Sequence, residues 1–167
     1  MTSRSEGLPA DATARVITVS DRSYAGTRPD ESGPLLAELL AALGFGTSGP
    51  VVVPDELTAV ERALRDAVAE GVDVVATTGG TGLAPRDVTP EATRGVIDRE
   101  VPGVAEALRL YHRDEIPTTI LSRSVAGIAG STLIVNLPGS TGGVKDGVAV
   151  LSPVIGHAVG QLRGGDH

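Results

Sequence analysis

Two aspartates lie where the end of a parallel strand would place ligands for a metal ion. Asp55 follows the apolar run 51–53, and Asp87 follows a glycine-rich segment that comes after the apolar run 72–76. Each precedes a region with a helical pattern and could cap that helix, but in both cases a nearby threonine is better placed to do so. Mg²⁺ in proteins typically takes one or two carboxylates together with phosphate oxygens of a substrate. The pair therefore predicts either a Mg²⁺ site or two solvated loop acids, and the spacing alone leaves both open.

The glycine-rich segment is the second candidate. Its residues are Thr77, Thr78, Gly79, Gly80, Thr81 and Gly82. Glycines directly after a strand let backbone N–H groups approach a phosphate closely, although a tight strand-to-helix turn has the same composition. The segment does not end in Gly-Lys-Ser/Thr, as a P-loop does, and Pro85 stands where a dinucleotide fingerprint needs its third glycine. It therefore predicts a loop that holds a phosphate or a ring in another way.

A third candidate follows the apolar run 133–135. Its residues are Asn136, Leu137, Pro138, Gly139 and Ser140, and an ordinary Pro-Gly turn is the alternative. Ser140 is not expected to be a nucleophile, because a proline replaces the glycine that a nucleophile elbow has two positions earlier. Arg86 and Arg123 lie near these segments and are expected to offset the charge of an anionic ligand.

Short apolar runs alternate with helical patterns along the chain, and this order would bring the candidates together. Strands are expected at the β-branched runs 15–19, 51–53, 72–77 and 133–135. Helices are expected from Ser32 to a cap at Gly44, at 57–67 with a capping box from Thr58 to Glu61, from Thr89-Pro90, from Pro102, and at 154–162. The alternation predicts an α/β domain with a mainly parallel sheet, to which residues 122–130 would add an antiparallel strand or small hairpin. Ligands of such sheets bind beyond the carboxyl ends of the strands, where all three candidates lie.

Composition narrows the class of protein. The chain has 167 residues, of which 41% are hydrophobic and only 2% aromatic, and this favours one domain with an aliphatic core. With 21 acidic and 14 basic residues the formal net charge is −7, which argues against nucleic acid or an anionic membrane as the main partner. Because the sequence contains no cysteine, thiolate catalysis, disulfides and iron–sulfur ligation are excluded.

The two ends of the chain are expected to lie outside the folded domain. Residues 1–13 are small and polar and lack the apolar segment of a signal peptide, so they are interpreted as a disordered tail. Residues 14–163 are expected to form the single domain, followed by a C-terminal tail at 164–167. No apolar run approaches the roughly 20 residues that span a bilayer, and a cytoplasmic protein is expected.

Taken in order, the segments that carry these candidates resemble those of molybdopterin adenylyltransferases. The resemblance runs over about residues 14–163, and its most specific part is the glycine-rich loop followed at once by Arg-Asp-Val-Thr-Pro at 86–90. The matching segments are Ser20-Asp21-Arg22, Asp30-Glu31-Ser32-Gly33-Pro34, Val53-Pro54-Asp55, Thr77 to Gly82, Pro85 to Thr93, Leu121-Ser122-Arg123 and Asn136 to Ser140.

The resemblance implies an enzyme that joins AMP from Mg-ATP to the phosphate of molybdopterin, with Mg²⁺ as cofactor and pyrophosphate as the second product. It also implies a three-layer α/β/α fold, with both substrates held at the carboxyl end of the sheet. Asp55 and Asp87 stand at the family's two essential aspartate positions and are the expected catalytic residues and metal ligands. The residues expected to bind substrate are Ser20, Asp21, Thr78, Gly79, Gly80, Thr81, Gly82, Arg86, Ser122, Arg123, Asn136, Pro138, Gly139 and Ser140.

The chain departs from the family at residues 141–143, where many members carry a basic residue. Either Lys145 replaces that residue from a few positions further on, or phosphate binding is weaker. The sequence also leaves two alternatives to the enzyme. One is a non-catalytic oligomer that binds molybdopterin and hands it on, and the other is a nucleotide-binding domain of the kind found in competence-damage proteins.

The expected oligomeric state rests mainly on the resemblance, which implies a homotrimer. The resemblance also implies that the product is handed over to the molybdate-inserting protein. The pattern itself indicates surplus apolar surface at 104–111 and 154–162, and we expect subunit contacts there. Base rates for soluble oligomers would favour a dimer on the pattern alone.

Overall fold

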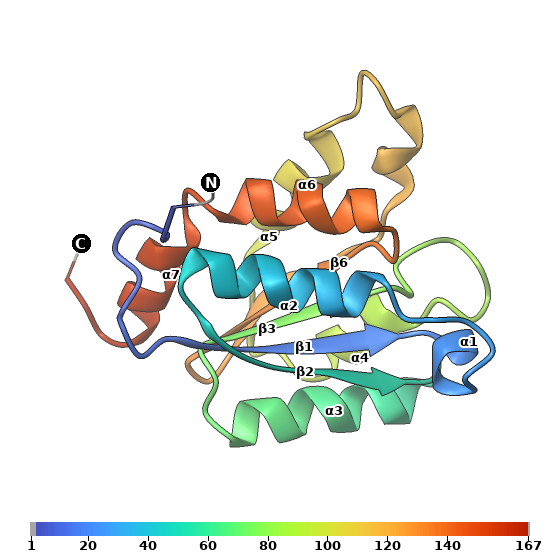
Figure 1. Cartoon of the computed structure of the whole chain (residues 1–167), viewed down its shortest axis with the longest axis horizontal. Helices are drawn as coiled ribbons and strands as arrows, with labels where there is room; N and C mark the ends of the chain where they lie inside the picture. Colours follow the sequence, from blue (N-terminus) through green and yellow to red (C-terminus); the bar gives the residue numbers. More distant parts are fainter. Residues whose placement is uncertain (1–2, 167) are drawn as a thin grey trace.

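A six-stranded sheet in the order β2-β1-β3-β6-β5-β4 runs through the middle of the molecule (Figure 1). The structure is a computed structural model and describes residues 3–166. The strands are β1 (Thr13–Val19), β2 (Gly46–Val53), β3 (Val74–Thr78), β4 (Arg99–Glu100), β5 (Ala126–Ala129) and β6 (Thr132–Leu137). Strands β2, β1, β3 and β6 are parallel, whereas β5 runs antiparallel to β6 and to β4. The expected mainly parallel sheet with one hairpin is confirmed, and β4 is a short strand that the sequence pattern did not indicate.

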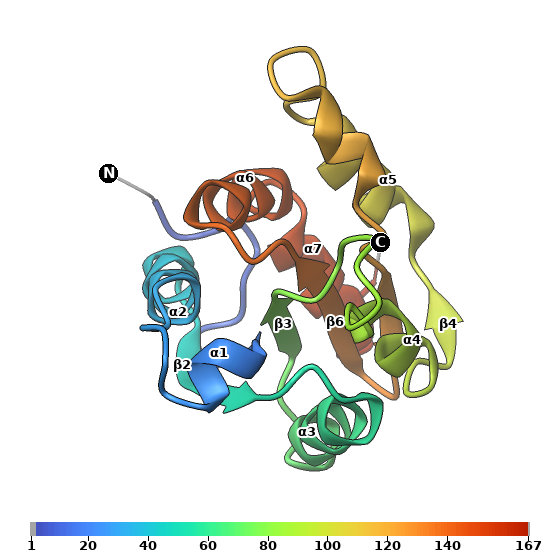
Figure 2. The ribbon, with the colours of Figure 1, turned by 90° about the vertical axis from the view of Figure 1, so that its right-hand side faces the viewer.

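Helices cover both faces of the sheet and complete the three layers that the resemblance implied (Figure 1). They are α1 (Asp21–Tyr24), α2 (Ser32–Leu43), α3 (Leu57–Ala69), α4 (Thr89–Arg94), α5 (Pro102–Leu110), the 3₁₀ turn η1 (Pro117–Leu121), α6 (Thr141–Leu151) and α7 (Ile155–Leu162). One core cluster joins α2, α6 and α7 to the sheet, and a second joins α3 and α4 to its other face. Helix α5 and η1 project from this body as an arm, seen at the top of Figure 2.

Helix ends agree with the sequence pattern only in part. Gly44 caps α2 in the left-handed region, at φ 111°, as expected. The capping box from Thr58 to Glu61 is wrong, because α3 begins after Glu56 and no side chain caps it. Thr89 is not a cap either: its hydroxyl donates to the carbonyl of Gly79, 2.9 Å away. A tertiary hydrogen bond therefore replaces the local one, and it fastens α4 to the glycine-rich loop.

The N-terminal segment is part of the fold, which corrects the disordered tail expected for residues 1–13. Leu8 and Ala12 are buried in the core with α2, α6 and α7. The backbone N–H of Ser5 donates to Leu43 O at 2.9 Å, and its hydroxyl donates to Ser152 O at the same distance. An isolated apolar residue such as Leu8 carries no periodic signal, so the pattern could not reveal this packing. Met1, Thr2 and His167 lie outside the described residues.

An ion-pair network ties the two ends of the domain together away from the candidate site. Arg163 donates from Nε and Nη2 to Asp73 at 2.8 Å each, and from Nη1 to Asp11 at 2.7 Å. Burial alone would raise the pKa of Asp73, but the hydrogen bonds from Arg163 and the Thr13 amide outweigh it and lower that pKa. This network lies just before the starts of β1 and β3, at the amino edge of the parallel strands and opposite the arrowheads in Figure 1. The carboxyl edge is left to the candidate loops. No helix among residues 3–166 is long and apolar enough to cross a membrane.

Candidate functional site

The site lies where the strand order reverses. Strand β1 has β2 on one side and β3 on the other, so the chain segments that leave β1 and β3 diverge at their carboxyl ends. Figure 2 looks onto this edge, with the glycine-rich loop between α1 and α4. A polar cavity of about 460 Å³ opens here, and it is lined by Thr18, Val19, Ser20, Ser23, Arg28, Pro29, Asp30, Glu31, Ser32, Thr78, Gly79, Gly139, Ser140 and Thr141. Crevices at such switch points are the usual ligand sites of open α/β sheets.

The glycine-rich loop has a conformation that side chains would disrupt. Gly79 and Gly80 both have positive φ, at 100° and 69°. A Cβ at Gly79 would overlap the carbonyl of Val19, and a Cβ at Gly80 would overlap the hydroxyl of Thr89. The backbone N–H groups of Gly80, Thr81 and Gly82 donate no hydrogen bond to any residue within 3–166. The loop therefore offers a row of donors suited to a phosphate, as expected for such a segment.

Asp55 and Asp87 lie near enough for their charges to interact, and Asp21 braces Asp55 through two hydrogen bonds. The N–H of Asp21 donates to Asp55 Oδ2 at 2.8 Å, and the N–H of Asp55 donates to Asp21 Oδ1 at 2.9 Å. Burial raises the pKa of Asp55, and the charges of Asp21 and Asp87 raise it further. Asp87 Oδ2 accepts a hydrogen bond from Ala84 N at 3.0 Å. The charges of the pair repel one another, so a cation at this place would be stabilised.

This donor set fits Mg²⁺ rather than a metal held by protein alone. Within residues 3–166 no group of three or more His, Cys, Asp or Glu side chains is placed to hold a metal ion. Two carboxylates are nonetheless the usual protein share of a Mg²⁺ site, since substrate phosphates and water supply the other oxygens. Asp55 and Asp87 would be that share.

Arg86 is committed to Asp21 in this structure. Its guanidinium contacts both carboxylate oxygens of Asp21, with Nη2 donating to Oδ1 at 2.9 Å. The hydrogen bond from Arg86 lowers the pKa of Asp21. These two residues, both expected to bind substrate, form an exposed ion pair that joins the segment after the glycine-rich loop to α1.

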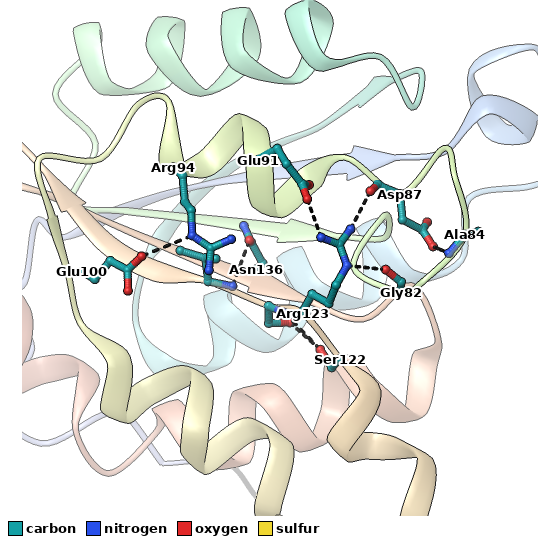
Figure 3. Close-up of polar contacts among 11 residues, drawn as sticks. Gly82, Ala84, Asp87, Glu91, Arg94, Glu100, Ser122, Arg123 and Asn136 are labelled. Carbon is teal, nitrogen blue, oxygen red and sulfur yellow. Dashed lines mark hydrogen bonds and ion pairs between the residues drawn. The ribbon is translucent and has the colours of Figure 1, made fainter.

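Asn136 lies beneath the site and not in it, which corrects its assignment as a substrate-binding residue. Its amide nitrogen donates to the hydroxyls of Thr77 and Thr93, at 3.1 and 2.9 Å, and its carbonyl accepts from Val125 N at 3.1 Å. The residue is 0% exposed, so no polar atom of this side chain is open to a ligand. Figure 3 shows it between Arg94 and Arg123. Asn136 joins β6 to β3 and α4, and so holds the floor of the site.

A second cavity adjoins the first, and five residues from the expected substrate-binding set line it: Thr81, Gly82, Ser122, Pro138 and Ser140. It has a volume of about 480 Å³ and is lined by Thr81, Gly82, Leu83, Ile116, Thr118, Thr119, Leu121, Ser122, Pro138, Ser140, Gly142, Gly143 and Asp146. Ser140, which caps α6 through its side chain, lines both cavities. In the sequence, the apolar wall of this cavity is indicated by an apolar residue in a segment without helical periodicity, as for Leu83. In the structure the side chain of Leu83 is 66% exposed. In the polar cavity the lining residues that the expected substrate-binding set lacked are Thr18, Val19, Ser23, Arg28, Pro29, Asp30, Glu31, Ser32 and Thr141.

A mainly parallel sheet with a glycine-rich loop at its switch point is the architecture of α/β domains that hold ligands at the carboxyl edge of the sheet. The family model described as "Probable molybdopterin binding domain" matches residues 15–157, and the chain belongs to this family. The resemblance noted from the motifs is thereby confirmed.

Several known proteins are similar to this chain over most of its length. It is 43% identical over 137 residues to the molybdopterin adenylyltransferase of Haemophilus influenzae, and this match covers 78% of this chain and 68% of that protein. The solved structure of the molybdopterin biosynthesis Mog protein from Mycobacterium ulcerans has 46% identity and a TM-score of 0.88, covering 93% of this chain and 99% of that one. A CinA protein from Thermoplasma acidophilum, at 20% identity and a TM-score of 0.65, shares the fold alone.

Some relatives are longer. The chain is 40% identical over 161 residues to the molybdenum cofactor biosynthesis bifunctional protein of Synechococcus elongatus, a match that covers 96% of this chain and 50% of that protein. The chain thus spans about half the length of that bifunctional relative.

Proposed function

We propose that this chain transfers AMP from Mg-ATP to the phosphate of molybdopterin, giving adenylylated molybdopterin and pyrophosphate. The observation that carries the proposal is the pair of adjoining cavities, one polar and one largely apolar, which meet at Ser140 beside the glycine-rich loop. A transfer between two substrates needs two sites that share a boundary. The similarity to a molybdopterin adenylyltransferase supports the choice of substrates.

The residues suit this chemistry because the reaction needs alignment more than proton transfer. An oxygen of the molybdopterin phosphate, already anionic near neutral pH, forms a bond to the α-phosphorus of ATP. The bond from that phosphorus to the bridging oxygen breaks, and its electrons leave with pyrophosphate. No general base is required, which agrees with a site that has no cysteine and no histidine in the lining of either cavity.

Side chains and backbone N–H groups of the chain would stabilise the negative charge of the substrate phosphates. The free N–H groups of the glycine-rich loop would donate to phosphate oxygens. Asp55 and Asp87 would hold Mg²⁺, which when bound neutralises charge on the phosphates. The Asp21–Arg86 ion pair would keep Asp55 and the loop in place.

The deciding experiment uses purified protein with Mg-ATP and molybdopterin, and follows both pyrophosphate and adenylylated pterin. We expect equal amounts of the two products, and none in the presence of EDTA or after heat inactivation. Saturating substrates and Mg²⁺ that yield no product above the heated control would exclude the enzyme. Retained binding of molybdopterin in that case would favour the carrier, and binding of nucleotides without pterins would favour the generic nucleotide-binding domain.

We also infer a homotrimer that works in the cytoplasm and passes its product to the molybdate-inserting protein. Support for assembly comes from exposed apolar side chains at the ends of the two segments expected to make contacts. Tyr111, just after α5, is 47% exposed, and Val154, just before α7, is 48% exposed. A third, mostly apolar cavity of about 370 Å³ lies between α5 and α7. Light scattering should give three times the 16.9 kDa of the chain, and a mass of one or two subunits would refute the trimer. Cell fractionation and affinity capture with the molybdate-inserting protein test the other two points.

A further inference from the structure

A single arginine holds both ends of the segment that carries Asp87. Arg123 donates from its backbone N–H to Thr81 O at 2.9 Å and from Nε to Gly82 O at 2.8 Å. Its Nη2 donates to the carbonyl of Asp87 at 2.7 Å. Figure 3 shows the guanidinium between the two ends of this segment, with Glu91 on its other side. The carbonyls at both ends of the segment 81–87 therefore accept hydrogen bonds from one residue.

Apart from Arg123, the segment is attached to the rest of the domain by one exposed ion pair, between Arg86 and Asp21. Residues 83–86 are exposed, and none of them belongs to a core cluster. A turn within the segment is closed by hydrogen bonds between Ala84 and Asp87. That turn shapes the loop but does not attach it to the rest of the domain. The exposed Arg86–Asp21 ion pair attaches the side chain of Arg86 to α1. The backbone carbonyl of Asp87 itself is attached through the hydrogen bond from Arg123.

Arg123 is itself fixed on both sides. Glu91 of α4 pairs with its Nη1, and this hydrogen bond lowers the pKa of Glu91. Arg109 of α5 donates to the carbonyls of Ser122 and Ser124, at 3.3 and 3.0 Å, and so anchors the backbone around Arg123. The guanidinium thus has defined partners from the loop and from α4, and its side chain is only 33% exposed.

We propose that Arg123 is a positioning residue, which sets the Asp87 carboxylate and the glycine-rich loop for metal and phosphate without touching substrate itself. This assignment replaces the expectation that Arg123 offsets the charge of an anionic ligand. It rests on the proposed function for the role of Asp87, but the geometry of the loop is independent of it. A planar guanidinium can bridge two carbonyls in fixed directions, whereas a lysine ammonium cannot keep that fork.

The first test compares Arg123→Gln and Arg123→Lys with the control Arg94→Gln. Arg94 also lies at this side of the sheet, but it pairs with the exposed Glu100 and contacts no part of the loop (Figure 3). Hydrogen exchange of the amides at 80–88 is measured in the protein without substrates. We expect both Arg123 variants to exchange faster by about tenfold, the effect of losing one charge-assisted hydrogen bond, and the control to be unchanged. Unchanged exchange in both Arg123 variants would overturn the proposal.

The second test separates positioning from substrate contact. In both Arg123 variants we expect the Mg²⁺ concentration for half-maximal activity to rise by about 10–100-fold, as for residues that orient metal ligands. The KM values for ATP and molybdopterin should stay within about twofold, and lysine should not rescue. A raised KM with an unchanged Mg²⁺ requirement, together with rescue by lysine, would mean that Arg123 binds a substrate phosphate. If the wild type forms no product, the proposed function fails, and the exchange measurement alone decides the role of Arg123.

Discussion

Asp87→Asn should nearly abolish formation of adenylylated molybdopterin and leave the fold intact. Asparagine keeps the size of the side chain and can still accept the hydrogen bond from Ala84 N. The free energy of unfolding should therefore change by no more than about 0.5 kcal/mol. The negative charge that would hold Mg²⁺ is lost. We expect kcat/KM to fall by about 10²–10³-fold, the loss typical of one preorganised electrostatic contact to a transition state.

Asp55→Asn should give the same loss of activity with an additional signature in stability. A carboxyl whose pKa is raised on folding weakens the fold once it is ionised, and this cost is absent below the unfolded-state pKa. Without substrates and Mg²⁺, the variant should therefore be at least as stable as the wild type near neutral pH. The difference in unfolding free energy between the variant and the wild type should shrink as the pH falls through the raised pKa of Asp55 toward the ordinary value of 3.8.

Asp66→Asn is the matched control for both aspartates, because Asp66 is an exposed residue of α3 and lies away from the glycine-rich loop. Chemical unfolding at several pH values and product formation should both match the wild type in this variant. If Asp55→Asn or Asp87→Asn is strongly destabilised as its activity falls, the aspartate is structural and the metal-ligand role is not supported. Activity within about threefold of the wild type would refute that role directly.

Gly80→Ala is expected to impair both stability and activity. At φ 69° an alanine costs about 1–2 kcal/mol in the left-handed region. Its Cβ would also overlap the Thr89 hydroxyl and lie 3.2 Å from Asp55 Oδ1. The hydrogen bond from Thr89 to Gly79 O would then be disturbed, at a further cost of about 1 kcal/mol. Because Asp55 is pushed as well, we expect product formation to fall by more than about tenfold.

Gly71→Ala separates backbone strain from the close contact. Gly71 has a similar φ of 77°, but a Cβ there would meet no atom within 4 Å. This variant should lose about 2–8 °C in melting temperature from the left-handed conformation alone, and it should keep full activity. A melting temperature for Gly80→Ala equal to that of Gly71→Ala, with unchanged turnover, would show that the packing of the loop on Thr89 and Asp55 is unimportant.

The fold could be predicted where a signal is local and repeated. The β-branched runs of β1, β3 and β6 and the apolar stripe of α2 with its cap at Gly44 indicate their own structure, because burial selects residue types at a fixed period. Helix α6 carries Gly142, Gly143 and Gly147 and has no such clear signal. A Cβ at Gly147 would overlap the side chain of Leu137, so glycine there permits the close approach of α6 to β6. Only that packing explains the residue.

The sequence by itself determined the family, the parallel sheet and the loops at its carboxyl edge, including Asp55, Asp87 and the glycine-rich segment. These follow from residue types in a fixed order along the chain. The tertiary structure decided what each polar side chain does, since a hydrogen bond between distant segments leaves no periodic pattern. It committed Arg86 to Asp21, buried Asn136 under the site, and placed Arg123 across the ends of the Asp87 segment. It also made the second cavity, because its walls come from three segments that are distant in the sequence: the glycine-rich loop, η1 and the start of α6.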